Sequence, residues 1–226
     1  MSSDMRFLAL RLEGPLQSWG FDSQYNRRNT GLLPTKSAIA GMCCAALGLS
    51  RGCEEERQFL KSFGALRMAA IAIPRSSDKQ KPLPVRRLLD YHTVQNTRRA
   101  NGAINNDCVL THRMYLTDSA FGVILEGNAE VLTKISKALA DPKWGIWLGR
   151  KTCIPSAPVL AGLRDNRAEA LSLLIGDKPL ESFIRQEEVE FFSDGRDSLP
   201  DTPLSFSSER RMFAPRRVRI RQAGEK

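Results

Sequence analysis

The chain has 226 residues, of which 42% are hydrophobic and 26% are charged, the balance of an ordinary soluble globular protein. It lacks the run of about 18 apolar residues that would predict a membrane-spanning helix, and its first residues lack the pattern of a secretory signal. We therefore expect a cytoplasmic protein that binds no membrane. The formal net charge is +9, and 24 of the 34 basic residues are arginine, whose planar guanidinium suits phosphate. This composition favours a nucleic-acid partner, although an arginine-rich proteome would also produce it.

The five cysteines and two histidines form no recognisable metal-binding pattern. No pair of cysteines has the C-x-x-C spacing of a zinc or thioredoxin site. Cys43 and Cys44 lie in an apolar stretch, where cysteine usually acts as a small buried side chain. We expect no metal and no other cofactor.

Hydrophobic periodicity divides the chain into strands and amphipathic helices. Thr35 or Ser37 can cap the first helix, and Asn128 can cap a later one. In chain order the sequence predicts a strand over Met5–Glu13, a helix from Thr35 or Ser37 to Leu47, a helix over Glu54–Phe63, a strand over Leu66–Pro74, a loop over Ser76–Pro84, a strand over Val85–Val94, strands over Val109–Leu116 and Ala120–Glu126, a helix from Asn128 to Asp141 and a short helix over Asn166–Ile175.

This order of elements predicts an α+β fold. Strand, helix, strand, strand, helix is most of a ferredoxin-like (RRM-like) βαββαβ unit, a scaffold shared by many RNA-binding modules, and we place it in residues 1–148. The polar stretch Gln95–Asp107 cannot contribute to a core, so we interpret it as part of an inserted β-hairpin. Residues 149–226 are irregular and predict a smaller β-rich domain, with the basic segment Glu209–Lys226 as a late strand.

Thr35, Lys36 and Ser37 lie together at the start of the first helix. Backbone N–H groups there lack intrahelical partners and carry partial positive charge, so hydroxyls and an ammonium beside them suit phosphate oxygens. The alternative is an ordinary helix cap with an exposed lysine.

The loop before this helix mixes basic and aromatic residues, as surfaces for single-stranded nucleic acid do. Tyr25, Arg27 and Arg28 are its candidate contacts, with a solvated loop as the alternative. Trp19, in the motif GPLQSWG, either stacks on a base or fills the edge of the core.

Further basic and aromatic residues follow on two predicted strands and their connection. Alternation along the strand places Tyr91 and Thr93 on one face, and Asp90 and His92 on the other. Beyond this strand we single out Arg98, Arg99, Arg113, Arg150 and Lys151 as candidate phosphate contacts.

No nucleophile and base occur together in a known catalytic motif, so we expect a protein without enzymatic activity. The alternative is an RNA-cleaving pair, His92 with either Tyr91 or His112.

Five segments, in order from Met5 to Gly162, resemble the Cas-five (Cas5) family of the RAMP superfamily, in the form found in the type I-E CRISPR surveillance complex, Cascade. They are RLEGPLQSWG, PTKSAIAGMCCAALGL, LLDYHTV, THRMYLTDSAFGVIL and WLGRKTCIPSAPVLAG.

The resemblance implies a ferredoxin-like domain with an inserted thumb, over about residues 86–113 here, and a smaller C-terminal domain. It implies a non-catalytic subunit that grips the 5′ handle of the CRISPR RNA, docks the large PAM-reading subunit and the first backbone subunit, and meets target DNA through the complex. Relatives in another subtype cut precursor CRISPR RNA, so a metal-independent endoribonuclease is the alternative.

The resemblance and the residue chemistry together predict one set of RNA-binding residues. We expect removal of Arg113 or Lys36 to weaken handle binding and to lower its salt dependence. The full set is Gln17, Ser18, Trp19, Tyr25, Arg27, Arg28, Thr35, Lys36, Ser37, Tyr91, His92, Thr93, Arg98, Arg99, Arg113, Arg150 and Lys151.

Overall fold

The computed structural model describes residues 5–76, 82, 83, 85–99 and 101–225. The helices in these residues are α1 (Lys36–Leu47), α2 (Glu54–Gly64), α3 (Ala129–Ala140) and α4 (Arg167–Ile175), with 3₁₀ turns at Leu180–Ser182 and Phe192–Asp194. The strands are β1 (Met5–Gln17), β2 (Arg27–Arg28), β3 (Arg67–Ile73), β4 (Arg75–Ser76), β5 (Pro82–Leu83), β6 (Arg86–Val94), β7 (Thr97–Arg98), β8 (Ile104–Asn105), β9 (Val109–Asn128), β10 (Leu160–Arg164), β11 (Arg185–Glu188), β12 (Asp197–Ser205) and β13 (Met212–Arg221).

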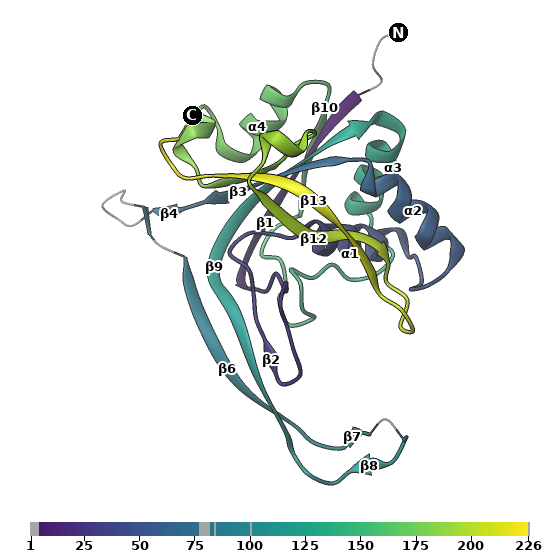
Figure 1. Ribbon diagram of the computed structural model, residues 1–226. Helices are drawn as coiled ribbons and strands as arrows, with labels where there is room; N and C mark the ends of the chain where they lie inside the picture. The colour runs from purple at the N-terminus through teal and green to yellow at the C-terminus, as the bar shows by residue number, and fades with distance from the viewer. Residues whose placement is uncertain (1–4, 77–81, 84, 100, 226) are drawn as a thin grey trace.

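Most of these strands join one large sheet, in the order β10-β1-β9-β3-β11-β13-β12, and neighbours along this path pair antiparallel. Strands β2 and β6 also pair with β9. The fold is therefore a mixed one, with a large antiparallel sheet and helices packed on it (Figure 1). In the part of the chain that the structure describes, no helix is long and apolar enough to span a membrane.

Alternation along β1 builds a core on each side of the sheet. Leu8, Leu10 and Leu12 face α1, α2 and α3 in the main core. Ala9 faces the other way and joins a smaller cluster with Ile124 and residues of α4. The strand predicted over Met5–Glu13 thus contributes to a core on each of its faces.

The helix ends follow the predicted signals. The hydroxyl of Thr35 accepts a hydrogen bond from the N–H of Ala38 at 3.3 Å and so caps α1. Asn128 caps α3 in the same way, accepting from the N–H of Val131 at 3.0 Å. Helix α1 ends at Gly48, whose φ of 70° suits glycine.

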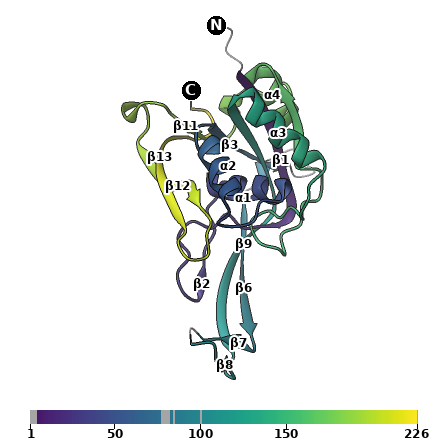
Figure 2. The same ribbon diagram turned by 90° about the vertical axis from the view of Figure 1, so that its right-hand side faces the viewer.

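A long β-hairpin projects from the body of the molecule (Figures 1 and 2). The two strands predicted over Val109–Leu116 and Ala120–Glu126 are one continuous strand, β9. Its first half pairs with β6 from Val94 opposite Val109 to Arg86 opposite Thr117, while its second half lies in the body. The hairpin covers the stretch 86–113 where the sequence predicted an insertion.

The last quarter of the chain extends the same sheet. Strands β11, β13 and β12 follow β3 in the strand order, and β10 pairs with β1 at the opposite edge. The division into domains at residues 148 and 149 stays a prediction. In the predicted loop Ser76–Pro84, residues 77–81 and 84 lie outside the described residues, while Ser76, Pro82 and Leu83 form a short ladder with Arg75.

Candidate nucleic-acid interface

The short strand β2 brings the basic loop against the base of the hairpin. Arg28 pairs with Arg113 of β9, and Asp90 of β6 pairs with Arg113 from the other side. Residues directly opposite each other in a sheet share a face, so Arg28 and Arg113 lie on the same face. Two segments that are far apart in the sequence therefore contribute guanidinium groups to one surface.

Arg150 adds a third guanidinium to this surface. Its Nη2 donates to the carbonyl of Arg28 at 2.8 Å, and its guanidinium carbon lies 4.5 Å from the centre of the Tyr115 ring. Its Nη1 is buried and meets no acceptor among the described residues. An unpaired buried donor costs about 1–3 kcal/mol, and an anionic oxygen would satisfy it.

The backbone before Arg150 explains how it reaches this position. The N–H of Ser18 donates to the carbonyl of Leu148 at 3.0 Å, which brings the two segments close together. A Cβ atom on Gly149 would lie 1.8 Å from the carbonyl oxygen of Ser18, and its φ is 100°. Only glycine fits there. Gly149 therefore lets the backbone pass close to Ser18, and this sets the position from which the Arg150 side chain starts.

The opposite face of the hairpin is aromatic. Tyr91 pairs with His112, and their rings meet edge to face with centroids 5.4 Å apart. Tyr91 is 59% exposed, as is suitable for a side chain that stacks on a base or packs on a partner. Arg27 pairs with His112 and lies on this face.

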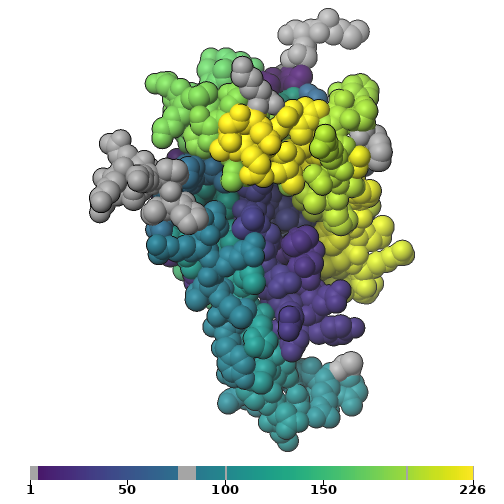
Figure 3. Space-filling view, turned by 60° about the vertical axis from the view of Figure 1, so that its left-hand side comes forward, coloured from purple at the N-terminus to yellow at the C-terminus, as the bar shows by residue number. Residues whose placement is uncertain are grey.

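Tyr25 lies in a tight turn of the loop between β1 and α1. The backbone of Gln24 and Arg27 forms two reciprocal hydrogen bonds of 3.0 and 2.8 Å around it. Tyr25 has a φ of 47° and is 91% exposed, so the turn presents an aromatic ring to solvent. Figure 3 shows this purple segment lying beside the base of the hairpin.

The remaining predicted contacts on the hairpin are exposed. His92 lies beside Asp90, with Nδ1 3.7 Å from Oδ2, and Thr93 follows it. At the tip, Nη2 of Arg99 donates to Oδ1 of Asn105 at 3.1 Å, and Arg98 is in β7. Lys151, next to Arg150, is exposed as well.

The predicted contacts at the end of β1 are wrong for this structure, because their side chains are buried. Gln17 is 0% exposed and donates to the carbonyls of Leu12 and Ser119. Ser18 is 4% exposed. Trp19 is 0% exposed and packs edge to face on Phe121 with ring centroids 6.3 Å apart, so it belongs to the core and offers no face to a base.

The predicted phosphate site at the start of α1 is also wrong, because the chain supplies its own anions there. The carboxylate of Asp201 accepts a hydrogen bond from the N–H of Lys36 at 2.8 Å. The ammonium of Lys36 is buried and lies 2.9 Å from Oε1 of Glu188. Thr35 is 8% exposed and serves as the helix cap, while Ser37 is part-exposed.

Arg216 completes this buried charge cluster. Its Nε lies 2.6 Å from Oδ1 of Asp201, and its Nη1 lies 3.6 Å from Oε2 of Glu188. The two cations and two carboxylates balance, which is how buried charges are tolerated. Lys36 is therefore a structural residue that joins α1 to β11, β12 and β13.

Two residue groups at this surface are not in the predicted set of RNA-binding residues. Arg86 and Arg87 are exposed at the start of β6. The ring of Tyr115 makes a cation–π contact with the guanidinium of Arg150. The basic start of the β6 segment was a visible signal for the arginines. Nothing in the sequence pairs Tyr115 with Arg150, because 35 positions separate them.

The geometry bears on the predicted RNA-cleaving pairs. Tyr91 and His92 are neighbours on one strand and point to opposite faces, so they cannot both act on one phosphodiester from the same side. His112 pairs with Tyr91 and shares its face, so His92 and His112 also point to opposite faces. In the described residues, no three His, Cys, Asp or Glu side chains converge to hold a metal ion.

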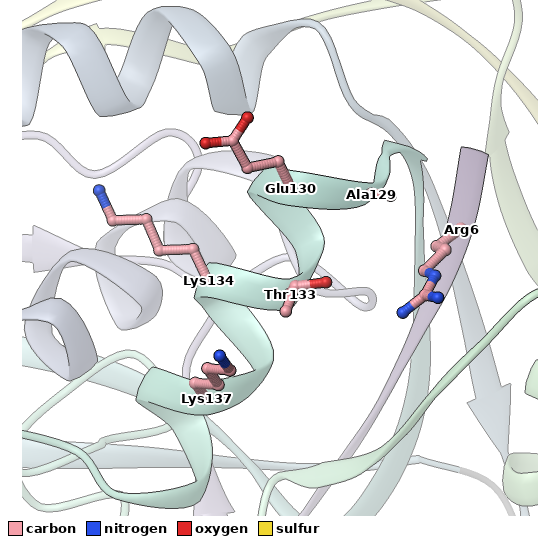
Figure 4. A pocket seen from close by; sticks show the side chains of 6 residues that line it. All are labelled: Arg6, Ala129, Glu130, Thr133, Lys134 and Lys137. Atoms are coloured by element: carbon pink, nitrogen blue, oxygen red, sulfur yellow. The ribbon is translucent and has the colours of Figure 1, made fainter. Parts of the chain in front are cut away.

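A separate pocket opens between β1 and α3 (Figure 4). Arg6 lies at its edge and forms an ion pair with Asp165 at 3.0 Å. No predicted RNA-binding residue lines it. The lining residues are Arg6, Ala129, Glu130, Thr133, Lys134 and Lys137.

Comparisons with known proteins agree on one family. The family model described as "CRISPR-associated protein (Cas_Cas5)" matches residues 7–219. The chain is 31% identical over 160 residues to the CRISPR system Cascade subunit CasD of Escherichia coli strain K12, an alignment that covers 69% of this chain and 70% of CasD.

Two solved structures share the fold along nearly the whole chain. A chain of a CRISPR RNA-guided surveillance complex matches with a TM-score of 0.73 and 27% identity, covering 95% of this chain and 88% of its own. The crystal structure of a Cas protein matches with a TM-score of 0.67 and 33% identity, covering 97% of this chain and 95% of its own.

Proposed function

The chain belongs to the Cas5 family of CRISPR-associated proteins, and from this membership we propose that it is the subunit of a type I-E Cascade complex that grips the 5′ handle of the CRISPR RNA. The alignment with CasD, a Cascade subunit, supports membership of such a complex. The handle-binding role rests on the surface described above.

The observation that carries the proposal is the gathering of Arg28, Arg113 and Arg150 at the base of the hairpin. Guanidinium groups on one surface neutralise consecutive phosphates, and exposed aromatic rings beside them receive unstacked bases. Tyr25, in the same loop as Arg28, supplies such a ring, and Tyr91 presents another on the opposite face of the hairpin. Recognition of single-stranded RNA needs this combination and needs no reacting group.

We also infer that the body contains a ferredoxin-like unit. Strands β10, β1, β9 and β3 lie side by side and antiparallel, with α1 and α2 between β1 and β3, and α3 between β9 and β10. This order supports a βαββαβ unit into which the hairpin is inserted as the thumb.

The protein acts without catalysis in this proposal. The hairpin and the rest of the surface would then dock the backbone subunit and the large PAM-reading subunit, so that target DNA is met through the complex. The separation of Tyr91 and His92 onto opposite faces supports this view over cleavage by that pair.

The test is co-expression of the tagged chain with a CRISPR array and the neighbouring genes, followed by purification and crosslinking. We expect a stoichiometric complex with mature CRISPR RNA, in which this chain crosslinks to the 5′ handle. Recovery of the chain free of RNA and of other subunits would overturn the proposal.

The enzymatic alternative is tested by incubating the purified chain with precursor CRISPR RNA in a metal chelator. We expect no cleavage. Cleavage that is lost in His112→Ala or His92→Ala, and kept in a control such as Arg51→Gln on the exposed α1–α2 connection, would establish a ribonuclease instead.

A further inference from the structure

The C-terminal strand β13 turns a row of arginines to the outside of the sheet. Arg216 and Val218 are 5% and 0% exposed and point inward, where Arg216 joins the buried charge cluster. Side chains alternate along a strand, so Arg217, Arg219 and Arg221 point outward, and all three are part-exposed. In Figure 3, β13 forms part of the molecular surface, in yellow.

The spacing of this row suits a polyanion. Every second residue of an antiparallel strand is displaced by about 6.8 Å, so the three arginines leave the backbone at a regular interval along β13. Each presents a planar fork of donors that fits phosphate oxygens. The row can therefore follow the backbone of an extended nucleic-acid strand.

The charges beside the row leave it positive. Glu187 of β11 lies opposite Arg219, but its carboxylate is already 2.7 Å from Arg167 and 3.4 Å from Arg185. Nε of Arg219 donates to the backbone carbonyl of Asp194 at 2.7 Å, a contact that orients the side chain without neutralising its charge. The Glu187 carboxylate is therefore shared between Arg167 and Arg185, and Arg219 makes no ion pair with it.

The row is separate from the candidate interface at the hairpin. Strands β3 and β11 lie between β9 and β13. Arg219 pairs with Glu187, which continues through Ala69 to Ile124, so the row lies level with Ile124, eleven residues along β9 from Arg113. At about 3.3 Å per residue this is about 36 Å, so the two places are separate sites.

We propose that Arg217, Arg219 and Arg221 form a second binding site, which holds the sugar–phosphate backbone of a single nucleic-acid strand without reading its bases. This site differs from the proposed handle-binding site, because it would contact phosphates and would not depend on the base sequence.

The test measures the affinity of the full chain for a labelled single-stranded RNA of one repeated base, which lacks any handle sequence, as salt is raised. Each phosphate contact on a single strand contributes about 0.7 to the slope of log K against log salt. We expect the variant Arg217→Gln, Arg219→Gln, Arg221→Gln to lower this slope by about 2. The variant with lysine at the same three positions should keep most of it, because it keeps the charge.

A matched control removes three exposed cations from the helical side of the molecule, by Arg51→Gln, Lys61→Gln and Lys134→Gln. It should change the slope far less. The site is overturned if the glutamine variant binds like the wild type, if the control loses as much, or if the lysine variant loses as much as the glutamine variant. Should the triple variant not fold, Arg221→Gln alone is expected to lower the slope by about 0.7.

A readout with handle RNA separates this site from the proposed function. The glutamine variant should weaken binding of handle and repeated-base RNA by the same factor, so the preference for the handle stays unchanged. Arg113→Gln should reduce that preference instead. Loss of another complex subunit from the glutamine variant, with RNA binding intact, would assign the row to an acidic protein and overturn the site.

Discussion

The ammonium of Lys36 lies 2.9 Å from Oε1 of Glu188, although 152 positions separate the two residues in the chain. The same ammonium donates to the carbonyls of Gly64 and Leu66 at 3.1 and 2.6 Å. Lys36 therefore clamps the start of α1 to the end of α2 and to β11, and its charge is used inside the protein.

The first prediction concerns the stability contributed by this lysine. Lys36→Met should lower the free energy of unfolding by about 3 kcal/mol, because it leaves carboxylates and carbonyls buried without their cation. Denaturant unfolding measures this. Arg113→Gln, on the surface, should stay within about 0.5 kcal/mol of the wild type. A Lys36→Met protein of wild-type stability that binds RNA weakly would restore Lys36 to the interface.

The second prediction follows from the titration of the same residue. Burial lowers the pKa of Lys36 by more than the attraction of Glu188 raises it. Between the lowered pKa and the ordinary value of 10.5, the unfolded chain holds a proton that the folded chain releases. The contribution of Lys36 to stability therefore rises with pH in this window and is constant below it. The stability of the wild type minus that of Lys36→Met should grow toward pH 10.5; a shrinking difference would mean a raised pKa.

The third prediction concerns Arg113 and Arg150. Replacing either with glutamine should weaken binding to handle RNA and lower the salt slope by about 0.7, as loss of one phosphate contact on a single strand does. Fluorescence anisotropy over a salt series measures both quantities. The control is Arg51→Gln, which removes an exposed arginine away from the hairpin. Equal slopes in all these variants would remove the two arginines from the interface.

The fourth prediction separates two aromatic residues of the β1–α1 loop. Tyr25→Ala should weaken RNA binding by about 1–3 kcal/mol, the contribution of one stacked base, and leave stability unchanged. Trp19→Ala should instead destabilise the fold by about 3–5 kcal/mol, because it empties a core position. Thermal unfolding and RNA titration of both variants measure these effects. A Trp19→Phe protein that folds normally but binds RNA poorly would contradict the core assignment.

The fifth prediction concerns the thiols. Burial raises the pKa of Cys44 to about 12 and raises that of Cys43 and Cys153 as well, so these thiols stay protonated. Cys108 is exposed near the tip of the hairpin. A thiol reagent at neutral pH should modify Cys108 ahead of the three buried cysteines, and Cys108→Ser should abolish this fast reaction. Protection of Cys108 by handle RNA would place RNA near the tip; fast modification of Cys43 would contradict the described burial.

Local signals predicted much of the fold, since they depend on neighbours in the sequence. The alternation of β1, the Thr35 and Asn128 caps and the polar excursion of the hairpin are all of this kind. The five-residue strand β10 was missed because it has no alternation and pairs with β1 from more than 140 positions away.

The errors at the candidate site have the same origin. A lysine at a helix start has every local feature of a phosphate contact, and only Glu188 and Asp201, contributed by later strands, show that its charge is already neutralised. Likewise Phe121, which packs on Trp19, lies about a hundred positions later. The roles of Arg113 and Arg150 as RNA contacts stay predictions.

The charge cluster at the start of α1 also has a consequence for synthesis on the ribosome. Helix α1 emerges early, but the carboxylates of Glu188 and Asp201 and the guanidinium of Arg216 emerge only near the end of translation. Until then the nascent chain carries an unpaired Lys36 and lacks the strands that cover α1. Because such long-range pairing is slow to form, α1 can complete its native contacts only after the last strands have been synthesised. A prematurely terminated chain would therefore keep an exposed apolar helix, which chaperones and proteases can bind.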